Sequence, residues 1–447
     1  MPRTGYSPYA SRFTASTQKL QRECRKILLE EIRENSVDVE ELFNLHGVDY
    51  TGFVLCTFRD TGSFMWGTVD DLYREKATSL EMFRETVNDT ILLFGLKWHH
   101  RVFKTTENRP WLPLVFSVSH YGGAPIENGV LEYSVWSEDG KMLYSGEKSG
   151  LSAPMGALKC LETTVYIYNN VPDKYQKLTV GARLRWDENG CMKPASNHWS
   201  VWLAPAPSLP EKEQKDLFID VSDPWLYTQL MATYPAAGNC TRETCQLLIT
   251  DKLDENTYRF LARGGRVLLL GQNHFKTAVT EFGSARSEFD RGTVIADHPL
   301  FRNIPNDGWC DIPFCGLISD NRALEGNRNS VGCVYELEEG WPDDLEPIIM
   351  GVPSYKAEAP LKQAHMLEVQ VGKGRLLASP MKFGSPHAQS AFDLYFLDEV
   401  LKYMVSDDFS PKAVMSERAL RKVQTDGPSY LQIAIRDVNV FRSEVRG

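Results

Sequence analysis

Long apolar runs are missing from the sequence, and no stretch approaches the ~18 apolar residues that a membrane-spanning helix needs. The first residues also lack the apolar segment of a secretory signal peptide. Positive charge is not in excess, because 49 Lys and Arg residues stand against 59 Asp and Glu residues, a formal charge of −10. Since non-specific nucleic-acid binding needs a basic face, we expect a folded, soluble chain that binds neither nucleic acid nor membranes.

Several motifs of cofactor and nucleophile chemistry are also missing. The sequence contains no G-x-G-x-x-G, no G-x-x-x-x-G-K-[ST] and no G-x-S-x-G. Its nine cysteines are an odd number, and the pairs Cys240/Cys245 and Cys310/Cys315 each have four intervening residues. That spacing is loose for zinc, and no histidine lies at finger-like spacing. We therefore expect reduced structural thiols, no metal site and no cofactor.

The chain has 447 residues, which at ~150 residues per domain suggests about three domains. The first region comprises residues 1–104. Within it, Leu20, Cys24 and Ile27 share an apolar stripe that predicts a helix over 16–35. A continuous apolar run over 52–58 predicts a buried strand, and a second helix is expected over 79–88. This α/β rhythm predicts the incomplete tail of a (β/α)8 barrel.

The second region, residues 105–207, alternates between apolar and polar positions. Leu112, Leu114, Phe116 and Val118 share one face of a predicted strand. Similar sets recur between turn signals such as Glu188-Asn189-Gly190. About 100 residues of strands with period two predict an immunoglobulin-like β-sandwich.

The third region, residues 208–405, returns to the α/β rhythm. Strands are expected over 246–250 and 266–270, and Asp254 can cap the helix between them. A hairpin is expected around Gly372-Lys373-Gly374, and a last helix over 391–404. These elements predict a three-layer α/β domain. Residues 406–447 are weakly patterned and are interpreted as a C-terminal tail.

The loop after the first buried strand holds the candidate substrate-binding residues, Asp60 and Trp66. A carboxylate accepts hydrogen bonds from sugar hydroxyls, and an indole packs on the C–H groups of a sugar ring. A structural alternative is that Asp60 caps its turn or pairs with Arg59. Glycoside hydrolysis needs two opposed carboxylates, and only one acidic residue can be placed at a strand end. No catalytic residue is therefore assigned.

Two further sites can be weighed from the sequence. The third region resembles a class I glutamine amidotransferase domain in its rhythm, but the turn after the strand 266–270 is Gly271-Gln272-Asn273-His274 and has no cysteine nucleophile. His274 and His298 are interpreted as turn and packing residues. Among the aromatic side chains, Trp186 and Trp199 are expected in the core. Exposure of Trp111, Trp136 and Trp202 would favour a carbohydrate-binding surface.

Several segments, in order along the chain, resemble glycoside hydrolase family 2 of the β-galactosidase-like kind. Residues 18–33 resemble the last but one barrel helix, and residues 52–71 resemble the final barrel strand and its loop. The family often has Gly-Gln-Gly-Thr where this chain has Phe64-Met65-Trp66-Gly67-Thr68. Asn197-His198-Trp199 resembles the end of the following sandwich. Residues 297–301 and 371–376 resemble the amidotransferase-like C-terminal domain of some members.

The resemblance implies a retaining β-glycosidase parent whose two catalytic glutamates lie on earlier barrel strands. The first hypothesis is therefore a C-terminal fragment that is inactive alone, with carbohydrate, a missing N-terminal barrel portion or a second copy of the chain as its partners. Many family members are exported, whereas the compartment of this chain is left open. The alternatives are a non-catalytic carbohydrate-binding or scaffolding module, and an independent enzyme that uses the α/β domain.

Overall fold

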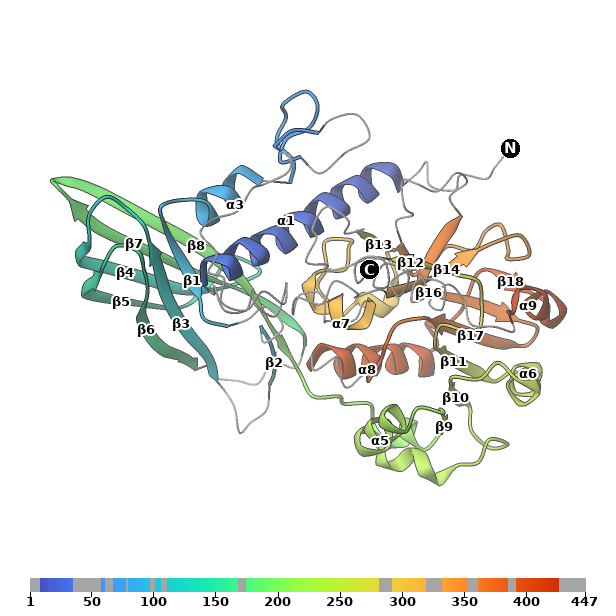
Figure 1. Ribbon diagram of the computed structural model, residues 1–447. Helices are drawn as coiled ribbons and strands as arrows, with labels where there is room; N and C mark the ends of the chain where they lie inside the picture. The colour runs from blue at the N-terminus through green and yellow to red at the C-terminus, as the bar shows by residue number, and fades with distance from the viewer. Residues whose placement is uncertain are drawn as a thin grey trace, which may run out of the picture.

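The computed structural model is that of a mixed α/β protein with several β-sheets. The long helix α1 (Ala10–Glu34) lies between a β-rich part and an α/β part, as Figure 1 shows. The structure describes these residues: 9–34, 58–60, 67–77, 79–96, 101–105, 111–167, 174–280, 292–318, 332–351, 361–384 and 391–425.

The β-rich part consists of two sheets. The three-stranded sheet has the order β1 (Thr90–Phe94), β3 (Trp111–His120), β6 (Ala157–Ile167). The five-stranded sheet has the order β2 (Val102–Lys104), β8 (Cys191–Ala204), β7 (Gln176–Glu188), β4 (Ile126–Ser137), β5 (Met142–Ala153). Both sheets contribute to one apolar core, so they form a β-sandwich.

The alternating pattern decides which side chains fill this core. Leu112, Leu114, Phe116 and Val118 are all fully buried on the inner face of β3, as the period of two predicts. The turn between β7 and β8 has a φ of 57° at Asn189 and 81° at Gly190, a left-handed conformation that suits an Asn-Gly hairpin. Strands β1 and β2 precede residue 105, so the sheets include residues that the sequence assigned to the barrel remnant.

The α/β part is built on a mixed sheet. Its main path is β12 (Thr277–Thr280), β14 (Gly332–Leu337), β16 (Lys362–Val371), β17 (Gly374–Ser379), β11 (Arg266–Leu270), β10 (Leu247–Thr250), β9 (Leu217–Asp220). Off this path lie β13 (Thr293–Ile295), β15 (Ile349–Gly351) and β18 (Val414–Met415). Strands β9, β10, β11 and β17 run parallel, and the β16–β17 hairpin is antiparallel.

Most of the other described helices are short. The remaining α-helices are α3 (Ser79–Thr86), α4 (Glu211–Gln214), α5 (Pro224–Thr233), α6 (Glu255–Ala262), α7 (Cys315–Ile318), α8 (Ala391–Val405) and α9 (Glu417–Val423). The 3₁₀ helices are η3 (Pro235–Asn239), η4 (Pro299–Phe301) and η5 (Ile312–Phe314).

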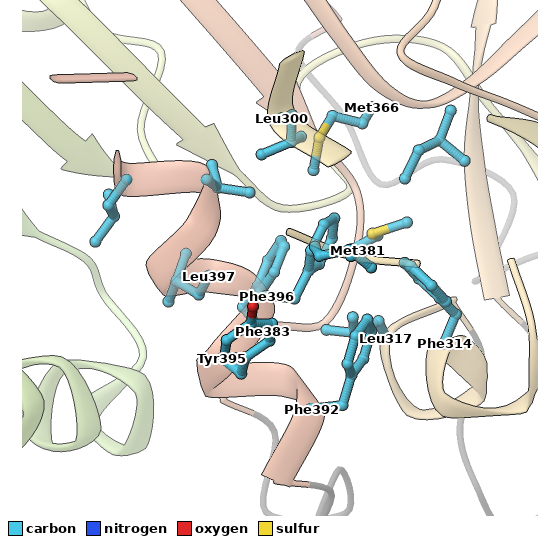
Figure 2. Close-up of a cluster of buried hydrophobic side chains, with 14 of the residues drawn as sticks. Leu300, Phe314, Leu317, Met366, Met381, Phe383, Phe392, Tyr395, Phe396 and Leu397 are labelled. Atoms are coloured by element: carbon cyan, nitrogen blue, oxygen red, sulfur yellow. The ribbon is translucent and has the colours of Figure 1, made fainter. Parts of the chain in front are cut away.

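Two apolar cores cover the two faces of the parallel strands. Leu247 and Ile249 of β10 face the core that contains α8, whereas Leu248 faces the core that contains α6. The arrangement is therefore helices, sheet and helices in three layers. Figure 2 shows the first of these cores, where Phe314 and Phe396 pack edge to face with ring centroids 5.3 Å apart.

Several predicted elements of the third region are confirmed. Helix α6 begins after Asp254, whose carboxylate accepts a hydrogen bond from Thr257 N at 2.9 Å, and Gly264 follows it with a φ of 97°. The hairpin and the last helix are present at the predicted positions. The sheet also extends past residue 405, because β18 pairs with β16.

The first region is described only in part. Helix α1 is confirmed but begins at Ala10, six residues before the predicted start, and α3 ends at Thr86. The predicted strand 52–58 and the candidate Trp66 lie outside the described residues, apart from Phe58, which is exposed. No helix in the described ranges is long and apolar enough to span a membrane.

Candidate functional site

Helix α1 is fixed to the sandwich by a network of buried polar groups. Lys26 Nζ donates hydrogen bonds to the side chain of Asn197 and to the backbone oxygen of His198, and forms an ion pair with Glu85. One turn further along, Glu30 Oε1 accepts hydrogen bonds from Asn197 Nδ2 and Trp199 Nε1, both at 2.9 Å. A buried charge is stable only when it is paired in this way.

Electrostatics keeps the Glu85 carboxyl charged. Burial alone would raise the pKa of the Glu85 carboxyl, but the hydrogen bond with His198 and the charge of Lys26 outweigh burial, so the pKa lies below its usual value. The side chains of Glu81, Glu85 and His198 also converge, with ligand atoms within 4.8 Å of one another. Lys26 already pairs with Glu85, however, and an ammonium group at that carboxylate opposes a second cation.

The network forms one wall of a cavity of about 370 Å³ between α1, the sandwich and the loop that carries Asp307 and Trp309. Five cationic side chains line it: Lys19, Arg22, Lys26, Arg101 and Lys177. Two carboxylates, Glu23 and Asp307, also line it. A cavity of this size suits a small ligand, and its lining favours a polar one.

The two lining carboxylates already form ion pairs. Glu23 pairs with the neighbouring Arg22, and Asp307 lies 3.7 Å from Lys19. Both carboxylates of the lining are therefore engaged with cations. His198 also lines the cavity, with its Nδ1 on Glu85.

The predicted site residue Asp60 lies in its own loop, away from the lining of this cavity. Both of its oxygens lie 3.0 Å from Lys76 Nζ, and Oδ1 also accepts a hydrogen bond from Gly67 N at 2.7 Å. The carboxylate therefore closes the loop, as in the structural alternative, although the pairing partner is Lys76. Contact of Asp60 with a sugar stays a prediction. Trp66 lies outside the described residues, so the structure does not bring the two together.

A second, shallower groove lies on the five-stranded sheet, with a volume of about 600 Å³. Its lining includes Trp136, Met142, Ser134 and Arg183. The side chain of Trp136 is 37% exposed, and its Nε1 donates a hydrogen bond to Ser134 Oγ at 2.8 Å. Trp111 is 44% exposed but lies on the other sheet, so the two rings do not form one strip.

The other predicted aromatic and histidine positions are structural. Trp186 and Trp199 are buried as predicted, and Trp202 is buried as well, so it is not part of a binding surface. Buried His274 contacts the backbone oxygen of Leu270 at 3.0 Å. His298 caps η4 by accepting a hydrogen bond from Leu300 N.

The paired thiols Cys240 and Cys245 are not activated as nucleophiles. The eight cysteines in the described part of the chain are all free. Burial, together with the neighbouring Cys240, raises the pKa of Cys245 to about 12, and burial also raises the pKa of Cys240. Reactive cysteines have the opposite property, a lowered pKa.

Sequence reasoning missed the cavity. Lys19, Arg22 and Lys26 lie in residues 18–33, a segment noted only for its family resemblance, and Lys177 and Trp309 are not singled out. The lining comes from α1, from β7 and β8 and from the loop after η4, and no local motif joins these segments. The recurring cations on α1 were the available signal, but charges on a helix usually mark its solvated face.

Comparisons with known proteins give two family matches. A model described as Domain of unknown function (DUF8488) matches residues 113–205, and one described as Domain of unknown function (DUF8487) matches residues 248–425. Each match covers less than half of the chain. A search of curated proteins gives no match.

Solved structures give distant matches, among them glycoside hydrolases. A Parabacteroides merdae β-glucuronidase is 11% identical, with a TM-score of 0.17, over 40% of this chain and 25% of that one. A family 123 glycoside hydrolase from Clostridium perfringens is 12% identical, with a TM-score of 0.17, over 36% of this chain and 32% of that one. A sporulation control protein from Bacillus subtilis is 12% identical, with a TM-score of 0.18, over 28% of this chain and 52% of that one. The chain thus spans about a quarter of the length of the β-glucuronidase.

Proposed function

We propose that this chain is the C-terminal part of a family 2-like glycoside hydrolase of the β-galactosidase-like kind. In this proposal the chain binds carbohydrate but does not itself cleave the glycosidic bond. In this proposal α1 belongs to the catalytic barrel, the sandwich is immunoglobulin-like, and the α/β part is an amidotransferase-like domain without its cysteine. A missing barrel portion, or a second copy of the chain, completes the assembly.

One observation carries the proposal: two segments that resemble the family, far apart in the sequence, are in contact. Lys26 and Glu30 lie in the helix segment, and Asn197 and Trp199 lie in the segment that resembles the sandwich end. These residues form the buried network described above, over separations of up to 171 residues. Contact between these two segments is what we expect if they belong to adjoining parts of one such enzyme, and it supports the proposal.

The lack of opposed acids supports the non-catalytic part of the proposal. Glycoside hydrolysis uses two carboxyl groups facing each other across the scissile bond. In the cavity lining, the two carboxylates are already ion-paired. In the α/β part, burial raises the pKa of Cys333 to about 11 and that of Cys245 to about 12, which disfavours a thiolate nucleophile at these two positions.

An assay of the purified chain with a panel of aryl β-glycosides tests the proposal. We expect no release of aglycone above the rate of a mock purification. Glu23→Gln is the matched variant, because it removes one cavity carboxylate with little change in shape. Turnover by the wild-type chain that Glu23→Gln abolishes would contradict the proposal.

The second candidate function is a carbohydrate-binding module, and the exposed ring of Trp136 favours it. An indole face beside polar Ser134 and Arg183 suits a sugar ring with hydroxyl groups at its edge. We expect Trp136→Ala to weaken binding of β-linked oligosaccharides at least about tenfold, measured by isothermal titration calorimetry. Trp111→Ala, an exposed indole on the other sheet, is the control and should leave the affinity unchanged. Equal affinity of both variants and wild type would remove this candidate.

A further inference from the structure

Three of the cations that line the cavity lie close to indole rings. Lys19 Nζ lies 5.9 Å from the Trp309 ring centroid, and Lys26 Nζ lies 6.0 Å from that of Trp199. Lys177 Nζ lies 5.7 Å from the ring centroid of Trp202. Rings at this distance attract a cation and restrict its motion. The cationic groups are therefore ordered before any ligand arrives, which lowers the entropy cost of binding.

The carboxylates that balance these cations mostly lie outside the cavity lining. Lys177 pairs with Asp311 at 2.6 Å, and Arg101 pairs with Glu30 at 3.5 Å. Neither acid lines the cavity. Burial alone would lower the pKa of Lys177, but Asp311 and the more distant acids raise it overall, so the ammonium stays charged. Among the described residues, the inner surface therefore carries five cations against two carboxylates, in a chain whose net charge is −10.

One cationic group has hydrogen-bonding capacity left over. Arg22 forms an ion pair with Glu23 through Nη1. Its Nε is buried and has no hydrogen-bond partner within the described part of the structure. A buried donor without a partner costs free energy, and a rotation of the Arg22 side chain toward the cavity would let a ligand oxygen satisfy it. A guanidinium group is well suited to this, because its planar donors match carboxylate and sulfate oxygens.

From these observations we infer that the cavity is a binding site for an anionic sugar, whose carboxylate or sulfate group is held by Arg22, Lys19 and Lys177. The cavity volume of about 370 Å³ suits a ligand of monosaccharide or disaccharide size. The sugar part of this inference rests on the proposed function, whereas the anionic part rests on the lining itself.

Calorimetric titration of the full-length chain with three probes tests the inference: D-glucuronate, D-glucose 6-sulfate and D-glucose. We expect at least one charged sugar to bind about tenfold or more tightly than glucose, and its affinity to fall as salt is added. Which charged sugar binds better shows whether carboxylate or sulfate is the preferred group. Binding of glucose as tight as that of both charged sugars, or no binding of either charged sugar, would overturn the inference.

Variants locate the site. Arg22→Gln should weaken binding of the charged sugar about tenfold or more, because it removes a charge-assisted hydrogen bond. Lys19→Gln is a second variant that should fold normally, since its side chain is 44% exposed, and it should also weaken binding. Lys148→Gln, which removes the same charge from an exposed ion pair on the sandwich, is the control. Unchanged affinity in both cavity variants would contradict the site. Hydrolysis by the wild-type chain would overturn the proposed function without altering this binding result.

Discussion

Two aspartates of helix α8 show how partners decide the effect of a buried carboxyl group. Asp398 is fully buried but accepts hydrogen bonds from Ser208 N and Leu209 N. Asp393 is also buried, and neither of its oxygens has a partner among the described residues. Burial raises the pKa of Asp393 well above its usual value. The folded protein therefore holds a proton on Asp393 that the unfolded chain releases.

This difference predicts a dependence of stability on pH. Because the folded pKa of Asp393 is raised, its contribution to stability is fully present below the unfolded pKa of about 3.8 and is lost as pH rises toward the folded pKa. We expect Asp393→Asn to remove this loss above about pH 4, measured by urea unfolding. Asp398→Asn should instead lower the free energy of unfolding throughout. An unchanged pH dependence in Asp393→Asn would contradict the assignment.

The Asp60–Lys76 pair gives a second prediction for single residues. The two side chains are 14% and 8% exposed, so loss of either partner leaves a poorly solvated charge. We expect Asp60→Asn to lower the free energy of unfolding by about 2 kcal/mol, measured by urea denaturation. Lys76→Met should cost a similar amount, and the double variant should cost less than the sum. Strictly additive costs would show that the pair is not coupled, and loss of sugar binding without loss of stability would support a sugar contact for Asp60.

At the scale of elements, helix α1 depends on the charge it buries. Lys26→Met leaves Glu85 without its ammonium partner, and we expect a loss of about 3–5 kcal/mol in the free energy of unfolding. Lys19→Met is the matched control on the same helix, because its ion pair with Asp307 is exposed and should contribute about 0–1 kcal/mol. Urea unfolding of both variants measures the difference. Equal costs would mean that the buried network does not hold the helix.

The sequence predicts individual elements better than it predicts where they pack. Alternation placed Leu112, Leu114 and Phe116 in the core, and Asp254 and Gly264 marked the two ends of α6, because these signals act within a few residues. Strands β1 and β18 are short and were not foreseen, since their pairing with β3 and β16 supplies their stability. The sequence could not predict the partners of Lys26 either, because Asn197 is 171 residues away along the chain.

At the scale of the whole molecule, the candidate sites differ in how they arise. The groove beside Trp136 belongs to the five-stranded sheet, so a strand pattern and one exposed indole can suggest it. The cavity requires α1, the sandwich and the loop at Trp309 to meet, and it exists only in the assembled fold. The sequence, interpreted as three successive regions, therefore predicted α1 and the sandwich but not the cavity that forms where they meet the loop at Trp309.

The proposed glycoside hydrolase part and the anionic-sugar cavity both depend on α1 lying docked between the sandwich and the α/β part. Amide hydrogen exchange of the full-length chain, resolved by peptide, measures this directly. We predict that the amides of α1 around Cys24 and Ile27 are protected as strongly as those of β8, because the helix is buried there and opens only with the fold. Exchange of α1 at the rate of an unfolded peptide, while β8 stays protected, would contradict the docked helix and the cavity it forms.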